Sequence, residues 1–313
     1  MNGAFHFIIN PVAGGGRPLR IWPLLRERLD TLGVRYEASV TQAPHDAAEI
    51  AAAIPEGVVA VAVGGDGTLN EMVRGVAPGR TIGLIPAGRG NDFARTAGIS
   101  PSPLIALQQL LKGESRPVDL PFVNGRPFLN VAGIGFDAHV AQRAGGARGR
   151  GALPYLSAVM HTLRRYRPSR LTIEVDGHKS EGEVFLLAVG NCRYYAGGMK
   201  ICPSAYFDDG LLDLCIAGKL STTEVLLALL SVFRGAHVRQ RKIHYLKAHS
   251  IRVDGPGDVL IQADGEVLGG LPAEFTLKQR ALKVVVPRGA WTPSKVTSIR
   301  RWAEEKRSTG SSP

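Results

Sequence analysis

Three short segments combine glycines with polar or charged residues, and each follows an apolar run of the sequence. They are NPVAGGG at residues 10–16, GGDGT at 64–68 and PAGRGNDFAR at 86–95. Glycine tolerates positive φ and lets a ligand approach the backbone. A helix that begins at such a turn adds unpaired N–H groups and the positive end of its dipole. The three segments therefore predict binding of phosphate groups.

The GGDGT segment also places a carboxylate beside the predicted phosphate. Gly64, Gly65 and Gly67 tolerate positive φ and let a ligand approach the backbone of the turn. Asp66 would repel a phosphate unless a cation stood between them, so we expect Mg²⁺ to bridge this carboxylate and nucleotide oxygens. The segment lacks the lysine of a Walker A loop. On its own, it is also compatible with an ordinary turn in which Asp66 caps a helix.

Two further sites carry residues suited to phosphoryl transfer. Asn91 and Asp92 open a predicted helix and can cap it, while the neighbouring glycines expose backbone. Asp264 and Glu266, in ADGEV, offer a group that could take a proton from an attacking hydroxyl. They would share one face of a regular strand, but Gly265 indicates a bend, so only one need face the site. A hairpin turn with solvated acids is the alternative.

An alternation of strands and helices positions the three glycine segments. We predict strands at 4–10, 34–40, 58–63 and 81–85, and helices at 18–32, 45–54, 68–76, 91–97 and 102–112. Strands separated by helices imply parallel βαβ units. Because ligands of such sheets lie beyond the carboxyl ends of the strands, the three segments should converge on one crevice.

From about residue 118 the pattern changes to short alternating runs with Asp-Gly turns, which predict antiparallel β structure arranged as a sandwich. A helical insertion is expected at about 153–166. Its basic exit, RRYRPSR, is compatible with a solvated helix end or with a membrane contact. The same two readings apply to the basic tail at 300–307.

The charge balance favours an anionic partner. The chain has 38 Lys and Arg against 27 Asp and Glu, a net charge of +11. Nucleotides, acidic lipid surfaces and nucleic acids would all fit this charge. Aromatic residues make up 6% of the chain and are not interleaved with a basic run, which argues against nucleic acid.

The remaining composition predicts a cytoplasmic protein. The three cysteines have no CxxC spacing, so neither a disulfide framework nor a zinc site is expected. The first residues lack the pattern of a signal peptide. The longest apolar helix candidate, EVLLALLSVF at 224–233, is far shorter than a bilayer span. Contact with a membrane would therefore be peripheral, at its inner face.

The motifs, in their order and spacing, resemble those of the bacterial lipid kinases of the diacylglycerol kinase catalytic-domain superfamily, which is related to NAD kinases and sphingosine kinases. NPVAGGG, GGDGTLNE and GNDFAR carry the resemblance, and FLNVAGIGFDAHV, residues 191–214 and ADGEVL extend it over nearly the whole chain. It implies an α/β nucleotide-binding domain with a parallel sheet of the NAD kinase and phosphofructokinase type at 1–120, rejoined by about 287–313. Residues 121–286 would form the C-terminal antiparallel β-sandwich domain.

The activity implied by the resemblance is ATP- and Mg²⁺-dependent phosphorylation of a hydroxyl of diacylglycerol or a related lipid. Asp264 would be the base, slightly ahead of Glu266. Arg89 stands where the family usually has threonine, and we hypothesise that its guanidinium binds a phosphate instead. The nucleotide would contact Asn10, Thr41, Gly64, Gly65, Asp66, Gly67, Thr68, Leu69, Asn70, Gly88, Arg89, Asn91 and Asp92.

The resemblance also implies two magnesium ions. Asp66, helped by Asp92 through water, would hold the catalytic ion. Asp209 and backbone carbonyls near Tyr206 and Leu211 would hold a structural ion, although Asp208 is equally placed on chemical grounds.

Two other functions fit parts of the sequence. An NAD kinase shares GGDGT, but we find no later Thr-Gly-Ser-Thr-Ala-type loop for a second nucleotide. A non-catalytic nucleotide or lipid sensor would not need Asp66 and the late DGE motif. The identity of the lipid and the oligomeric state, a homodimer included, stay open at this point.

Overall fold

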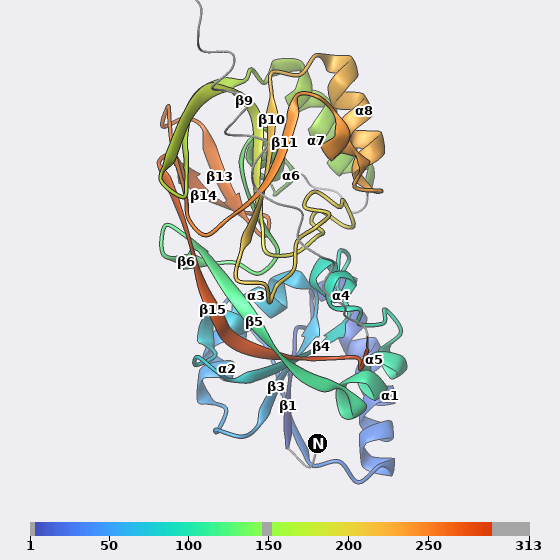
Figure 1. The fold of residues 1–313 in the computed structure, drawn as a ribbon. Helices are drawn as coiled ribbons and strands as arrows, with labels where there is room; N and C mark the ends of the chain where they lie inside the picture. The colour runs from blue at the N-terminus through green and yellow to red at the C-terminus, as the bar shows by residue number, and fades with distance from the viewer. Residues whose placement is uncertain (1–3, 146–151, 290–313) are drawn as a thin grey trace, which may run out of the picture.

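The computed structural model describes residues 4–145 and 152–289, which form two lobes stacked end to end (Figure 1). The N-terminal lobe contains a parallel sheet in the order β2-β1-β3-β4. All six residues of β3 are buried, as its continuous Val and Ala run predicts for a strand covered on both faces. The strands are β1 (Phe5–Ile9), β2 (Tyr36–Val40), β3 (Val59–Gly64) and β4 (Thr81–Pro86).

Helices flank this sheet, and the predicted alternation of strands and helices is confirmed. In Figure 1, α2 and α3 lie on one side of the strands, and α1 and α5 on the other. Several boundaries differ by one or two residues, and the one that matters for the site is that of α3. It begins at Asp66 and not at residue 68, which places the Asp66 carboxylate in the first helical turn. The helices are η1 (Ala13–Gly15), α1 (Arg17–Thr31), α2 (Asp46–Ala53), α3 (Asp66–Gly75), α4 (Asp92–Ala97) and α5 (Pro103–Lys112).

The C-terminal lobe is built from antiparallel strands, as predicted. Two layers of these strands enclose an apolar core that includes Phe128, Leu187 and Phe275. The strands are β5 (Glu114–Val123), β6 (Arg126–Pro127), β7 (Val131–Gly135), β8 (Ser169–Val175), β9 (His178–Gly190), β10 (Leu212–Gly218), β11 (Ile243–Ala248), β12 (Ile251–Asp254), β13 (Leu260–Ala263) and β14 (Glu266–Gly270).

Helices cover the outer face of β9 and β10. They are α6 (Phe136–Gly145), α7 (Ala152–Arg165), α8 (Thr222–Val232) and the short η2 (Ala236–Arg239). Phe136, Phe185 and Val225 belong to a second apolar cluster of this lobe, between these helices and the sheet. No helix within the two described ranges is both long and apolar enough to cross a bilayer.

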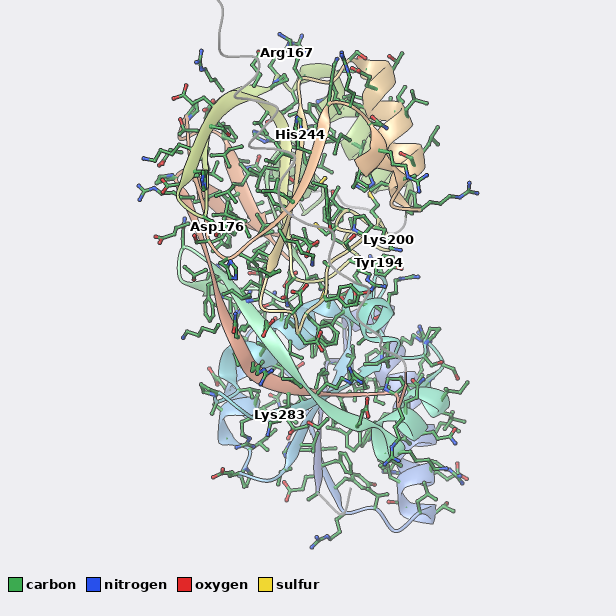
Figure 2. All side chains as sticks on the ribbon, viewed as in Figure 1. Arg167, Asp176, Tyr194, Lys200, His244 and Lys283 are labelled. Atoms are coloured by element: carbon green, nitrogen blue, oxygen red, sulfur yellow. The ribbon has the colours of Figure 1, made fainter. Side chains whose placement is uncertain are left out.

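One long strand, β15 (Ala273–Val286), connects the two lobes. It pairs antiparallel with β5, and its last residues also pair in parallel with β4, Lys283 opposite Thr81. Figure 2 shows Lys283 in the N-terminal lobe. The chain therefore rejoins the first sheet before residue 287, and most of the segment predicted to do so, from residue 290 on, lies outside the described residues.

Candidate active site

The three glycine segments meet at the carboxyl ends of β1, β3 and β4, as predicted. The Asn10 amide donates to Thr68 Oγ1 at 3.0 Å, which links the first segment to the second. A side chain at Gly14 would collide with the carbonyl oxygen of Ala87, so the first segment also lies against the third. The backbone amides of Ala87 and Gly88 both donate to the carbonyl oxygen of Gly64, at 2.7 and 3.1 Å.

Close packing, and not positive φ, explains Gly64 and Gly65 of GGDGT, whereas a Cβ at Gly67 would meet nothing within 4 Å. A Cβ at Gly65 would lie 2.9 Å from the Cα of Gly88, and one at Gly88 would be closer still to Gly65. Such contacts require two backbones without side chains. None of Gly64, Gly65 and Gly67 has positive φ, so the tolerance of glycine for that conformation is not used in this turn.

Asn91 closes its own loop and does not cap α4 through its side chain. Its φ is +52°, a conformation that asparagine tolerates better than most residues. Its amide oxygen accepts from Gly88 N at 2.9 Å, and its amide nitrogen donates to Gly88 O at 3.1 Å. The expectation that its side chain caps the helix is therefore wrong, because the carboxamide is already used within the loop.

Two carboxylates face each other across Gly90. A Cβ at Gly90 would lie 3.1 Å from Asp66 Oδ2 and 3.1 Å from Asp92 Oδ2. Phe93 N donates to Asp66 at 2.9 Å, and Gly197 N donates to Asp92 at 2.8 Å. Burial and the neighbouring Asp66 raise the pKa of Asp92 to about 6. Two like charges at this spacing favour a cation between them.

Two oxygen atoms at this carboxylate pair lack a hydrogen-bond partner. Asp92 Oδ1 and Asn130 Oδ1 are buried and accept no hydrogen bond within the described residues, although Arg95 Nε lies 3.9 Å from Asp92 Oδ1 as an ion pair. The amide nitrogen of Asn130 lies 3.5 Å from Asp66 Oδ1, so the three side chains form one group. Buried acceptors without donors are costly unless they bind a ligand, and oxygen donors of this kind suit Mg²⁺.

Asp264 lies at the turn between β13 and β14, with φ +48°, followed by Gly265 at +87°. Its carboxylate accepts from Asn70 Nδ2 and Leu129 N, both at 2.7 Å, and from the backbone amides of Asn130 and Val131 at 2.9 and 3.2 Å. Burial raises its pKa to about 6, although the backbone donors favour the ionised form. Asp264 therefore ties the C-terminal lobe to α3 of the N-terminal lobe.

Glu266 faces away from this carboxylate, as the predicted bend at Gly265 requires. It forms ion pairs with Arg74, at 2.9 Å, and with Arg126, and 43% of its side chain is exposed. Of the two acids of the DGE motif, Asp264 is the one beside Asp66.

A polar cavity of about 340 Å³ brings the carboxylates together. Sequence reasoning identified Asp66, Asp92 and Asp264 but missed Asn130, Asp137 and Gly197 of the C-terminal lobe. The cavity is lined by Asp66, Gly90, Asp92, Asn130, Val131, Asp137, Ala141, Tyr195, Ala196, Gly197, Gln262, Asp264 and Gly265.

A narrow apolar cavity of about 70 Å³ adjoins the polar one. It lies between the helices of the C-terminal lobe and the outer face of β9 and β10, and Asp137 and Tyr195 line both cavities. Phe136, Leu186 and Met199 are typical of its walls.

Asp137 is the carboxylate at the junction of the two cavities. It is buried, and it accepts from Gln262 Nε2 at 3.1 Å and from Ala138 N at 2.8 Å. Burial raises its pKa to about 6. The sequence feature that could have indicated Asp137 is a single acid directly after the apolar run VAGIGF.

The other predicted nucleotide residues have less distinctive surroundings. Thr41 is buried, and its backbone amide donates to Ile9 O at 3.0 Å. Leu69 is buried in the first turns of α3. Arg89 is exposed, and its guanidinium makes no hydrogen bond or ion pair within the described part of the chain, so it can reach a ligand.

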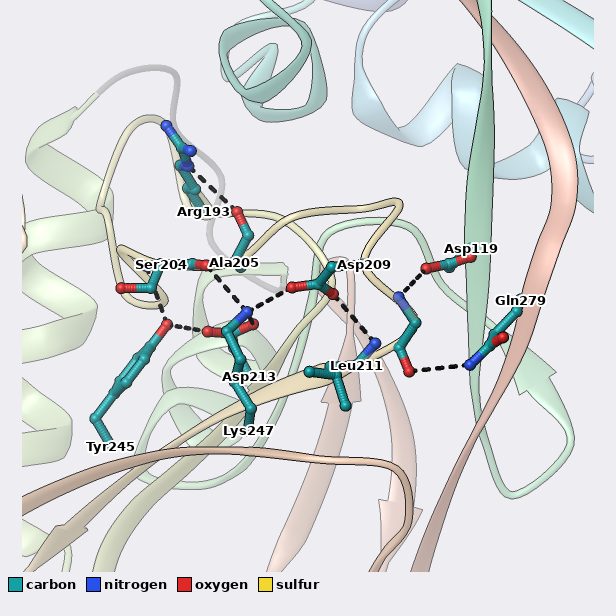
Figure 3. Close-up of polar contacts among 11 residues, drawn as sticks. Asp119, Arg193, Ser204, Ala205, Asp209, Leu211, Asp213, Tyr245, Lys247 and Gln279 are labelled. Carbon is teal, nitrogen blue, oxygen red and sulfur yellow. Dashed lines mark hydrogen bonds and ion pairs between the residues drawn. The ribbon is translucent and has the colours of Figure 1, made fainter. Parts of the chain in front are cut away.

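The loop predicted to hold a structural ion already contains a cation (Figure 3). Lys247 Nζ donates to Asp209 at 2.7 Å, to Asp213 at 2.8 Å and to the carbonyl of Ser204 at 3.2 Å. Burial would lower the pKa of Lys247, but the two carboxylates outweigh it and raise that pKa. The other oxygen of Asp209 accepts from Leu211 N at 3.1 Å. Lys247 offsets one of the two carboxylate charges that it contacts, and a second ion here stays a prediction.

Comparison with known families covers both lobes. The sequence model described as "Diacylglycerol kinase catalytic domain" matches residues 4–123, and that described as "YegS C-terminal NAD kinase beta sandwich-like domain" matches residues 130–286. A diacylglycerol kinase of Bacillus subtilis is 32% identical over 90% of this chain and 95% of its own length. The chain belongs to the diacylglycerol kinase family.

Other relatives agree with this family. A diacylglycerol kinase of Mycobacterium tuberculosis is 36% identical over 90% of this chain and 94% of its own length. The crystal structure of a protein from Bacillus anthracis described as a putative diacylglycerol kinase has a TM-score of 0.76 and 25% identity, covering 93% of this chain and 97% of that one. The two-lobed fold is therefore that of the family.

The fold also extends to NAD kinases. An NAD kinase of Archaeoglobus fulgidus, solved in complex with ATP, has a TM-score of 0.52 at 12% identity and covers 92% of this chain and 95% of its own. At this identity the likeness concerns the fold alone.

Proposed function

We propose that this diacylglycerol kinase family member transfers the terminal phosphoryl group of ATP to the hydroxyl of diacylglycerol or a related lipid. The observation that carries the proposal is the junction of the two cavities at Asp137 and Tyr195. One cavity offers carboxylates and the other an apolar wall, so a molecule with a polar head and a hydrocarbon chain would fit both. NAD, the acceptor of the alternative reaction, has no chain to fill the apolar cavity. The apolar cavity is narrow, and a lipid chain would widen it.

The nucleotide would lie on the converged glycine segments. The first turn of α3 supplies unpaired backbone N–H groups, which suit phosphate oxygens. Arg89 supplies an exposed guanidinium at the rim of the same crevice.

Asp66, Asp92 and Asn130 would hold Mg²⁺, because the last two have buried oxygens without donors. A bound Mg²⁺ would neutralise charge on the phosphates during transfer. Asp66 and Asp92 belong to the N-terminal lobe and Asn130 to the C-terminal lobe. An ion that they share would therefore hold the nucleotide of the first lobe beside the acceptor site of the second.

Two carboxylates would act on the acceptor hydroxyl, Asp264 as its base and Asp137 as the group that orients it. Asp264, the residue favoured by the sequence, lies in the polar cavity near Asp66. Its pKa of about 6 leaves it ionised at neutral pH, as a general base requires. Asp137 would orient the acceptor hydroxyl, because it stands where the polar head of a lipid would meet its chain.

Phosphate transfer from labelled ATP with Mg²⁺ tests the proposal, using micelles of diacylglycerol, monoacylglycerol, phosphatidylglycerol, ceramide or sphingosine, with NAD in a parallel reaction. We expect a labelled lipid, and its loss in Asp264→Asn. A Mg²⁺ titration of Asp66→Asn should require at least about tenfold more ion, because one of the two facing charges is gone. Labelled NAD without labelled lipid would contradict the proposal, and so would nucleotide binding without any product.

A further inference from the structure

Helix α8 has two apolar faces. Its inward face lines the apolar cavity through Val225, Ala228, Leu229 and Val232. On the other face, Leu227 is 60% exposed and Leu230 is 78% exposed, and Phe233, directly after the helix, is 58% exposed. Residues three apart lie on the same side of a helix, so these three side chains form one patch, here called the α8 patch.

The helix that carries this patch is firmly held. Ser221 and Glu224 form a capping box at its start, and Glu224 also pairs with Lys242 at 2.9 Å. The inward face is packed in the apolar cluster of the lobe. The exposed leucines therefore stand on an anchored helix, and burying such side chains is favourable.

Positive charge surrounds the α8 patch. From Val225 to His244 the chain contains Arg234, Arg239, Arg241 and Lys242 but no acidic residue. The three arginines are exposed, and their guanidinium groups make no hydrogen bond or ion pair within the described residues. Lys200, labelled in Figure 2, lies beside the end of α8, where its backbone amide donates to Val232 O at 3.1 Å. An apolar patch with basic flanks suits an anionic bilayer.

We propose that the α8 patch docks the protein onto the surface of an anionic lipid bilayer. Leu227, Leu230 and Phe233 enter the boundary between headgroups and acyl chains, and the arginines contact lipid phosphates. The helix has 11 residues, about 16 Å in length, so it lies along the surface. The consequence for catalysis rests on the proposed function: the wall of the apolar cavity then faces the membrane, and a lipid can move from the bilayer into the cavity past α8.

Vesicle co-sedimentation of the full chain tests the patch without reference to catalysis. The vesicles are phosphatidylcholine alone or phosphatidylcholine mixed with phosphatidylglycerol. We expect binding to the mixed vesicles that weakens as salt is added, since the headgroup attraction is screened. The double variant Leu227→Gln/Leu230→Gln should lose at least about tenfold in partitioning, because two apolar side chains no longer leave water. The matched control is Leu19→Gln/Leu24→Gln, two exposed leucines of α1, which should bind as the unmodified protein does.

The basic flank is tested separately with Arg234→Gln/Arg239→Gln/Arg241→Gln. We expect a loss of about fivefold for each arginine on anionic vesicles and little change on neutral ones. Unchanged vesicle binding in the leucine variant would overturn the proposal. The proposal would also be overturned if the unmodified protein were a dimer in vesicle-free solution and the leucine variant a monomer, since the patch would then contact a second copy of the chain.

The proposed function and the docking surface can fail independently. With a short-chain diacylglycerol in free solution, the leucine variant should retain turnover, because its substitutions lie outside both cavities. With the same lipid class in vesicles, its turnover should fall. Asp264→Asn should show the opposite behaviour, binding vesicles normally without phosphorylating either substrate.

Discussion

At the scale of single residues, Asp264 combines a chemical and a structural task. Asparagine tolerates a φ of +48°, so Asp264→Asn should keep the backbone conformation. Its N–H₂ group, however, would replace a carboxylate oxygen that accepts hydrogen bonds in the unmodified protein, and it would face donors such as Asn70 Nδ2 and Leu129 N. We expect Asp264→Asn to lower turnover by about 10²- to 10⁴-fold, the usual contribution of a general base, and to reduce the free energy of unfolding by about 1–3 kcal/mol. Steady-state kinetics and denaturant unfolding measure the two effects. Loss of stability with turnover intact would leave Asp264 a purely structural residue.

Arg89 provides a second prediction at this scale. If its guanidinium binds a nucleotide phosphate, Arg89→Ala should raise the KM for ATP by about 10- to 100-fold with little change in kcat, since a charged hydrogen bond is lost in ground and transition states alike. Arg252→Ala is the control, because Arg252 is exposed on the C-terminal lobe and pairs with Asp254. An unchanged KM for ATP would remove Arg89 from the site.

The sequence could identify residues whose role is local. Asp66 and Asp92 follow glycine turns at strand ends, and their neighbourhood depends only on the parallel order of β3 and β4. Asn130 and Gly197 reach the same cavity from the C-terminal lobe, through contacts between distant parts of the chain. No local pattern encodes those contacts, so these residues became visible only in the structure.

At the scale of elements, the loop before β10 depends on the buried cation of Lys247. The side chain of Lys247 is 10% exposed and that of Asp213 is not exposed at all, so removing the ammonium leaves carboxylates buried and unpaired. We expect Lys247→Met to reduce the free energy of unfolding by about 3–5 kcal/mol. Lys219→Met is the matched control, since Lys219 pairs with Glu183 at the surface and should cost no more than about 1 kcal/mol. If both variants lost the same free energy of unfolding, the buried ion pair would contribute no more to stability than the surface pair.

Elements were predictable where their signal is continuous. In the N-terminal lobe, β1, β3 and β4 are largely apolar runs that end at a glycine or proline or within two residues of one, whereas β2 mixes apolar and polar residues. Every predicted strand and helix of that lobe is present. The antiparallel character of the C-terminal lobe followed from period-two alternation. Its strand order did not, because β15 pairs with β5, β12 and β4, and register between distant strands is set by tertiary packing.

At the scale of the whole molecule, three buried acids of the polar cavity have raised pKa values, which make stability depend on pH. The pKa of Asp92, Asp137 and Asp264 is about 6 in the folded protein, above the ordinary 3.8. Between these pH values the folded protein binds more protons than the unfolded chain, so these groups make the free energy of unfolding fall as pH rises from about 4 to about 6. Asp137→Asn should flatten that dependence in denaturant titrations. A slope unchanged from the unmodified protein would contradict the raised pKa.

The same protons should compete with Mg²⁺, which links the charge of the cavity to the stability of the whole protein. Without nucleotide, Mg²⁺ should raise the midpoint of thermal unfolding at about pH 7.5 and hardly at about pH 5, because the ion binds the ionised form of Asp92, whose pKa is raised to about 6. Asp92→Asn should lose this shift, whereas Asp209→Asn should keep it, since Asp209 is already paired with Lys247. If Asp209→Asn lost the shift and Asp92→Asn retained it, the ion would bind in the Asp209 loop and not in the cavity. The ion-binding role proposed for the two oxygens beside Asp66 would then be wrong.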